Sequence, residues 1–278
     1  MHISKKQERR FYIINVILLI CFTVLWLIGN YIFSEVPEFG PSLFQSIMLI
    51  LAAGFAGTLC VYITFIYKYS TSSGKIWLLI GLGMFGWMIG DIIYTYYDLF
   101  TEEAPFPSIA DTFYLIAYVP LFLGFFLQYK ALKFPLTKNE KMINFVIFII
   151  ICIFVILSVL VFPILSWYGG EPIPPGDAFE IFVAVLYPIF DLHLLILVMI
   201  VLTKLRHGEI NKSWILLTLG ILFNIVGDIL FNWVTNAIGE EVLFEIFDLL
   251  YLVGYILIFM GAFTLITVVY KTFLSNES

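Results

Sequence analysis

Two stretches of this sequence are near copies of each other. KIWLLIGLGMFGWMIGDII occupies residues 75–93, and KSWILLTLGILFNIVGDIL occupies residues 212–230. A shift of 137 residues aligns them without a gap, so that Gly90-Asp91 falls on Gly227-Asp228. Each stretch is apolar over most of its length and ends near a Gly-Asp pair, a pattern that predicts a membrane-spanning helix carrying one inward-facing acid.

The match continues into the apolar run that follows each stretch. At the same shift Asp111 meets Asp248, and the further matched pairs are Trp77 with Trp214, Tyr114 with Tyr251, and Tyr118 with Tyr255. A repeat of four helices begins and ends on the same side of a membrane, so the two copies share one orientation. The sequence therefore predicts two parallel four-helix repeats, residues 1–137 and 138–278, related by a pseudo-twofold axis along the membrane normal.

The composition predicts an all-α, polytopic membrane protein. Of the 278 residues, 62% are hydrophobic and 12% charged, against about 45–50% and 25% in soluble domains. The apolar runs are too long for the strands of an outer-membrane barrel. No gap between them fits a soluble catalytic domain, and the net charge of −6 argues against nucleic-acid binding. We expect eight spans, at 11–29, 43–68, 75–98, 108–133, 141–168, 178–204, 212–237 and 242–270.

The basic residues predict the orientation of these spans. All 14 Lys and Arg fall before the first span, after the last, or in alternate loops and at the span ends beside those loops, whereas the other loops are acidic. Because short basic loops stay cytoplasmic, we expect a multi-pass protein of the cell membrane with both termini in the cytoplasm.

Several acids are expected inside the membrane without a basic partner. Asp91 lies 16 residues beyond Lys75, roughly 24 Å along a helix that rises about 1.5 Å per residue. The duplication places Asp228 at the same depth, Asp111 and Asp248 enter from the outer side, and Asp191 lies near mid-membrane. Such acids are expected to face the bundle interior or a hydrated cavity.

Neutral donors recur at helical spacing from these acids. Asp111 shares a helix face with Tyr114 and Tyr118, Asp248 with Tyr251 and Tyr255, and Asp191 with Tyr187; Asp228 is bracketed by Asn224 and Asn232, and Asp91 by Trp87 and Thr95. One interpretation is a set of hydrogen bonds that join the helices. The other is an outward-facing acidic and aromatic binding pocket. We expect no metal site and no cofactor, because no His or Cys lies near the outer aspartates.

The ordered recurrence of these residues resembles a known kind of module. They are Trp77, Gly90-Asp91, Pro105-Phe106-Pro107-Ser108, Ala110-Asp111, Tyr114-Leu115 and Tyr118, followed by Tyr187-Pro188, Asp191, Trp214, Asp228, Asp248 and Tyr251. Over residues 75–270 the chain resembles the N-terminal multi-helix membrane sensor segment of prokaryotic histidine kinases, PAS-domain sensors and diguanylate cyclases. The resemblance implies detection of a signal outside or within the membrane. The sequence ends at Ser278, without the output domain usual in that family, so we expect a separate cytoplasmic signalling partner.

Three functions follow as hypotheses. The first is a stand-alone membrane sensor or receptor-like module, not an enzyme, that binds a small ligand or cation in the bilayer-embedded pocket. The second is a proton- or cation-coupled transporter or channel, suggested by parallel repeats and intramembrane acids. The third is an intramembrane aspartyl hydrolase. Against the third, Met88-Ile89-Gly90-Asp91 and Ile225-Val226-Gly227-Asp228 both lack the first glycine of the GxGD signature.

Overall fold

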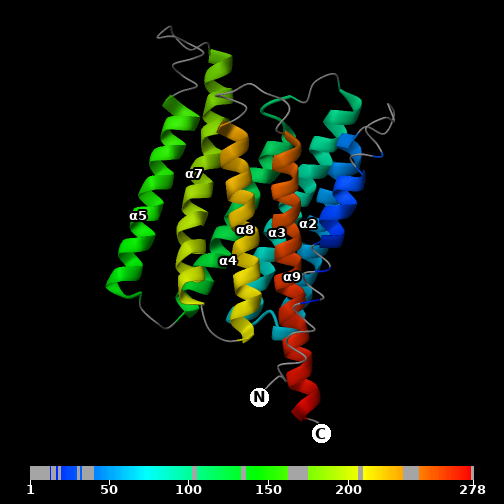
Figure 1. Cartoon of the computed structure of the whole chain (residues 1–278), viewed down its shortest axis with the longest axis vertical. Helices are drawn as coiled ribbons and strands as arrows, with labels where there is room; N and C mark the ends of the chain where they lie inside the picture. Colours follow the sequence, from blue (N-terminus) through cyan, green and yellow to red (C-terminus); the bar gives the residue numbers. More distant parts are fainter. Residues whose placement is uncertain are drawn as a thin grey trace.

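The computed structural model is a bundle of helices, and the residues that it describes contain no strand (Figure 1). It describes residues 13, 17, 20–29, 32, 41–101, 105–132, 136–161, 175–205, 209–233 and 244–276. The elements are α2 (Pro41–Tyr67), α3 (Ser72–Phe100), α4 (Ile109–Ala131), α5 (Lys138–Val155), the π-helical segment η1 (Ile156–Val161), α7 (Pro175–Lys204), α8 (Glu209–Trp233) and α9 (Phe244–Asn276).

Hydroxyl side chains fix where several helices begin. The Thr71 hydroxyl accepts a hydrogen bond of 3.0 Å from the Gly74 amide at the start of α3. At the start of α5, Thr137 and Glu140 form a capping box, in which each side chain accepts from the backbone amide of the other. These contacts satisfy amides that have no partner within the first helical turn.

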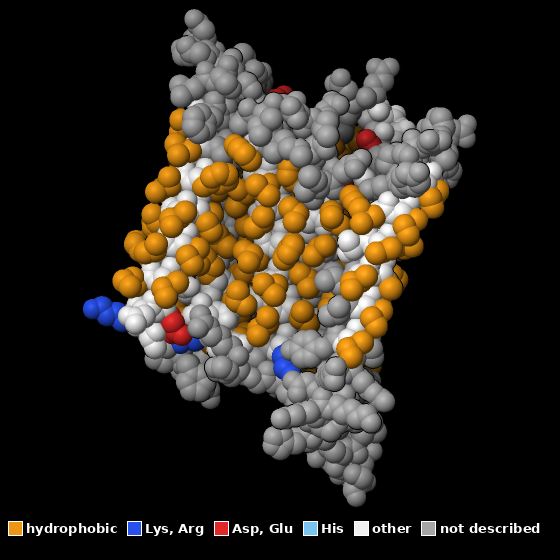
Figure 2. Space-filling model, viewed as in Figure 1, with side chains coloured by type: hydrophobic (Ala, Val, Ile, Leu, Met, Phe, Trp, Pro, Cys, Tyr) orange, Lys and Arg blue, Asp and Glu red, His pale blue; other side chains and the backbone are white. Residues whose placement is uncertain are grey.

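Six helices of the described ranges are long and apolar enough to cross a membrane, namely α2, α3, α4, α7, α8 and α9. Their outward side chains are largely apolar, and Figure 2 shows such side chains as a broad band across the middle of the face in view. The described lysines lie at helix ends on one side of this band, such as Lys75 at the start of α3 and Lys130 at the end of α4. Apolar surface of this extent on a helical bundle indicates a multi-pass membrane protein.

The two remaining expected spans are seen in part. Within 11–29, residues 20–29 form a short apolar helix whose Trp26 is buried in the core. Within 141–168, α5 and η1 continue as far as Val161, and residues 162–174 lie outside the described part of the chain.

The helix pairs α3–α4 and α8–α9 pack through matching contacts. In each pair glycines of the first helix lie directly against side chains of the second, so a β-carbon in their place would overlap those side chains. The contacts are Gly90 with Tyr114, Gly227 with Tyr251, Gly83 with Leu121, and Gly220 with Ile258. Each contact of one pair corresponds to a contact of the other after the shift of 137 residues.

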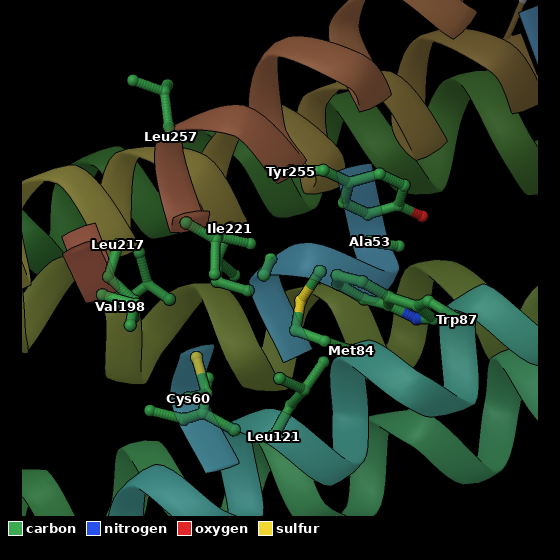
Figure 3. Packing of buried hydrophobic residues seen from close by; sticks show 14 of the residues in the cluster. Ala53, Cys60, Met84, Trp87, Leu121, Val198, Leu217, Ile221, Tyr255 and Leu257 are labelled. Atoms are coloured by element: carbon green, nitrogen blue, oxygen red, sulfur yellow. The ribbon is translucent and has the colours of Figure 1, made fainter. Parts of the chain in front are cut away.

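Contacts between distant helices are also matched. Helix α2 packs against α9, and α7 packs against α4. The rings of Trp77 and Trp214 meet with their centroids 5.2 Å apart, although they occupy equivalent positions of the duplicated stretches. Contact between two equivalent residues is expected where two copies are related by a nearby twofold axis. Figure 3 shows the apolar packing in this interior, with Ala53, Met84, Trp87 and Tyr255 among the labelled side chains.

Candidate functional site

The hydroxyl of Tyr118, on α4, lies between two carboxyl groups. It is 2.6 Å from Oδ1 of Asp191 on α7 and 2.9 Å from Oδ2 of Asp228 on α8. Tyr118 and Asp191 are both buried, and Asp191 is 0% exposed. One phenol therefore connects three helices. In the sequence Tyr118 is 73 residues from Asp191 and 110 residues from Asp228.

Two further phenols donate to acids at equivalent positions. Tyr114 donates to Oδ1 of Asp91 over 2.8 Å, and Tyr251 donates to Oδ1 of Asp228, also over 2.8 Å. In both pairs the tyrosine follows the aspartate by 23 residues. The glycine that precedes each aspartate lies against the ring of the same tyrosine. A larger residue at this glycine would push away the ring that supplies the hydrogen bond.

Asp111 has both a structural and an interhelical contact. Its Oδ2 accepts from the backbone amide of Ser108 over 2.6 Å and thereby closes the capping box of α4. Its Oδ1 accepts from the hydroxyl of Tyr187 on α7 over 2.6 Å. The first turn of α4 is thus tied to α7 by a bond separate from the one that Tyr118 makes.

Tyr255 and Asp248, both on α9, complete the group. Tyr255 is buried, lies close to Asp91, and its ring centroid is 6.0 Å from that of Trp87. Trp87 also contacts Tyr118, again at 6.0 Å, so one indole lies beside the two equivalent tyrosines. Asp248 is close enough to Asp91 to act on it electrostatically. The ten residues singled out from the sequence therefore lie on helices that pack together.

Some carboxyl oxygens in this group lack a partner among the described residues. They are Oδ2 of Asp91 and Oδ2 of Asp191, both buried. A buried carboxylate oxygen without a donor is costly in a low-dielectric interior. The described ion pair Lys204–Glu140, at 3.9 Å, joins α7 to α5 at the end of the bundle where the lysines lie, away from these acids.

The described residues contain no group of three or more His, Cys, Asp or Glu that could hold a metal ion. The described contacts of the site are hydrogen bonds between carboxyl groups and phenols. Such a site can bind and release protons, and it can accept hydrogen bonds from a polar ligand.

Helical spacing identified tyrosines that do donate hydrogen bonds to acids of this site. It did not identify which acid each tyrosine contacts. Tyr114 and Tyr118 were expected beside Asp111 of their own helix, yet they contact acids of other helices. Thr95 and Asn224 donate to backbone carbonyls of their own helices, at Asp91 and Gly220, instead of to a carboxylate. Spacing identified which residues face inward but not what faces them.

Trp87 makes two aromatic contacts in this site that the sequence did not suggest. It was expected only as a neighbour of Asp91 on the same helix face. It contacts both Tyr118 and Tyr255, which occupy equivalent positions of the two repeats. The only hint of this in the sequence is that equivalence.

Comparison of this chain with family models, with curated proteins and with solved structures found no match.

Proposed function

We propose that this protein is a membrane-embedded sensor or receptor-like module whose responsive centre is the carboxyl–phenol network. In this proposal residues 1–137 and 138–278 are two parallel halves of four spans each, eight spans in all. The matched glycine contacts and the Trp77–Trp214 contact support the pseudo-twofold relation. The apolar surface supports its place in the bilayer.

The observation that carries the proposal is the position of Tyr118. Its hydroxyl belongs to the first half, and both carboxyl groups that it contacts belong to the second. Tyr187 and Asp111 link the halves in the opposite sense. A ligand, cation or proton that changes the charge of this network therefore changes the contact between the halves, and two alternative arrangements of packed helices are the usual basis of a switch.

The response would be read on the cytoplasmic side. Both termini are assigned to the cytoplasm because the lysines gather at one end of the bundle. Movement of α4 against α7 would displace the loops at that end. A separate cytoplasmic signalling protein would be the partner that detects this displacement, in keeping with the resemblance to sensor segments.

The test measures the distance between the halves. Spin labels on Lys130→Cys in α4 and Lys141→Cys in α5 report on it, and labels on Lys75→Cys and Lys130→Cys give a matched pair within the first half. The background replaces the native Cys21, Cys60 and Cys152. In lipid nanodiscs we expect added H⁺, Na⁺, K⁺ or Ca²⁺ to change the first distance and not the second.

Tyr118→Phe should abolish the change, because it removes the hydroxyl that joins the halves. If none of the four cations alters the inter-half distance in the unsubstituted network, the sensor proposal is wrong for these signals. A change of equal size in both label pairs would indicate a general loosening of the bundle and would also count against it.

A second candidate function is proton- or cation-coupled transport. The observation in its favour is the fully buried Asp191, one of whose carboxyl oxygens has no partner among the described residues, since acids that face the interior of a bundle are common on ion pathways. Flux of protons or cations into liposomes that Asp191→Asn abolishes would establish transport. Liposomes holding folded protein but showing no flux would leave the sensor as the better proposal.

A further inference from the structure

Tyr118 makes two short contacts with carboxyl groups, and each contact needs a hydrogen between its two oxygens. A phenol has one hydrogen to donate, and an ionised carboxylate has none. The Tyr118 oxygen nevertheless lies within 2.6 Å of Asp191 Oδ1 and within 2.9 Å of Asp228 Oδ2. If both acids were ionised, one of these short contacts would place two oxygen lone pairs against each other.

The burial of the group makes two ionised acids still less favourable. Asp191 is 0% exposed, and it lies near enough to Asp228 for the two charges to repel each other. Charges in a low-dielectric interior interact strongly, and an isolated buried charge is costly. One extra proton removes both problems, because a protonated carboxyl group can donate to the phenol oxygen.

The surroundings of the two acids indicate which one holds the proton. Asp228 can accept two phenol hydrogens, one from Tyr251 on Oδ1 and one from Tyr118 on Oδ2. Asp191 has Tyr118 as its described partner, and its Oδ2 has none. The ionised form is therefore better stabilised at Asp228, and the neutral form is the better fit at Asp191.

We propose that Asp191, Tyr118 and Asp228 form a binding site for a single proton, carried by Asp191 in the closed arrangement of the helices. Every short contact in this series of hydrogen bonds then has a hydrogen. Asp191 donates to the Tyr118 oxygen, Tyr118 donates to Asp228, and Tyr251 donates to Asp228. This deepens the proposed function by naming the ligand as a proton, and its signalling role rests on that function.

The helices packed around Asp191 bring few groups that could compensate its charge. Helix α4 brings Tyr118, α8 brings Asp228, and Tyr251 of α9 and Tyr187 of α7 itself lie near enough to sense Asp191. The charged residues of α5, which also packs on α7, are Lys138, Glu140 and Lys141 in its first turn. Among the described residues packed around Asp191, the titratable neighbours other than Asp228 are thus phenols, which leaves the proton as the neutralising charge.

Loss of the proton would strain the junction between the halves. Two anionic carboxylates would then face one phenol hydrogen across α4, α7 and α8. Separation of α7 from α4 would relieve this repulsion and admit water to the exposed oxygens. The proton therefore holds together the same helices whose movement the sensor proposal requires.

Infrared spectroscopy tests the site directly, because a protonated carboxyl group has a carbonyl stretch that a carboxylate lacks. The full chain in lipid nanodiscs is compared with its Asp191→Asn variant at neutral pH. We expect a protonated-carboxyl band in the first that is missing from the second. Asp98→Asn, which changes an exposed aspartate of α3, is the matched control and should leave the band in place.

A second variant guards against misfolding of the first. Tyr118→Phe removes the acceptor for the Asp191 proton, so the band should move to the position of a carboxyl group with a weaker hydrogen bond. Overlapping spectra of the unsubstituted protein and Asp191→Asn, with both folded, would overturn the proton site, as would a band unmoved by Tyr118→Phe. If the infrared band confirms the proton site but the spin-labelled halves do not move, the sensor proposal is overturned instead. If cations move the halves but the band is absent, only the proton site is overturned.

Discussion

Replacement of Asp191 by asparagine should change how the stability of this protein depends on pH. The asparagine amide has the size of the carboxyl group and can donate from Nδ2 to the Tyr118 oxygen, as the protonated acid would. Position 191 carries no charge in either case. At acidic pH we therefore expect Asp191→Asn to alter the free energy of unfolding by no more than about 1 kcal/mol, the net value of a typical hydrogen bond.

The difference should grow as the pH rises. In an unfolded, solvated chain an aspartate ionises near about pH 4, whereas the folded site retains its proton. The folded state then binds one more proton than the unfolded state, so the free energy of unfolding falls by about 1.4 kcal/mol for each pH unit. Asparagine has no proton to lose, and this part of the pH dependence disappears. The sign follows from the proton count: the wild-type site is most stable at low pH and loses stability as pH increases.

Equilibrium unfolding in mixed micelles, followed by tryptophan fluorescence between about pH 5 and pH 8, measures this slope. The result of interest is the difference between the slopes of the unsubstituted protein and Asp191→Asn, because other acids contribute equally to both. Asp98→Asn should retain the slope of the unsubstituted protein. Parallel slopes for the unsubstituted protein and Asp191→Asn would refute the proton count at Tyr118, and so would a slope of the opposite sign.

Three further outcomes are expected. Gly90→Ala should destabilise the fold by about 1–3 kcal/mol, because its β-carbon would lie 2.5 Å from the Tyr114 ring; Gly227→Ala should behave alike, and unchanged thermal unfolding in both would contradict the close packing. Tyr187→Phe should cost about 1–3 kcal/mol in denaturant unfolding, since it leaves Oδ1 of Asp111 without its described donor; a neutral result would mean that this bond is not formed. Impermeant thiol reagents should reach cysteines placed at the lysine-rich helix ends only from the cytoplasmic side of oriented vesicles, and labelling from the outside would reverse the assigned topology.

The sequence predicts the helices of the duplicated stretches well. The span expected at 75–98 corresponds to α3, Ser72–Phe100, because a long apolar run between polar ends determines a helix in a bilayer. The span expected at 108–133 similarly corresponds to α4, Ile109–Ala131. The repeat further predicted equivalent depths for Asp91 and Asp228, and both accept from a tyrosine 23 residues later.

The partners of the tyrosines could not be obtained in this way. Spacing of three or seven residues places Tyr114 and Tyr118 on one face with Asp111, but a phenol extends from its helix and reaches across to a neighbour. Which neighbour it meets depends on how α4 packs against α7. The pairing of Tyr118 with Asp191 spans 73 residues and involves a helix whose counterpart, α2, has diverged, so no repeat pointed to it.

That divergence explains why the network is not symmetric. The position equivalent to Asp191 in the first half is Gly54. A β-carbon there would lie 3.0 Å from the sulfur of Met88 on α3, so an apolar side chain of the neighbouring helix lies close to the position where the second half carries a carboxyl group. Tyr118 thus meets two acids, whereas Tyr255, its equivalent, is near Asp91 and Trp87. The α4–α7 contact contains Asp191, a group that can gain or lose a charge, whereas many of the buried residues that α2 and α9 contribute to the core are apolar. In the sensor proposal, the bundle would therefore open at the α4–α7 contact while the α2–α9 contact stays closed.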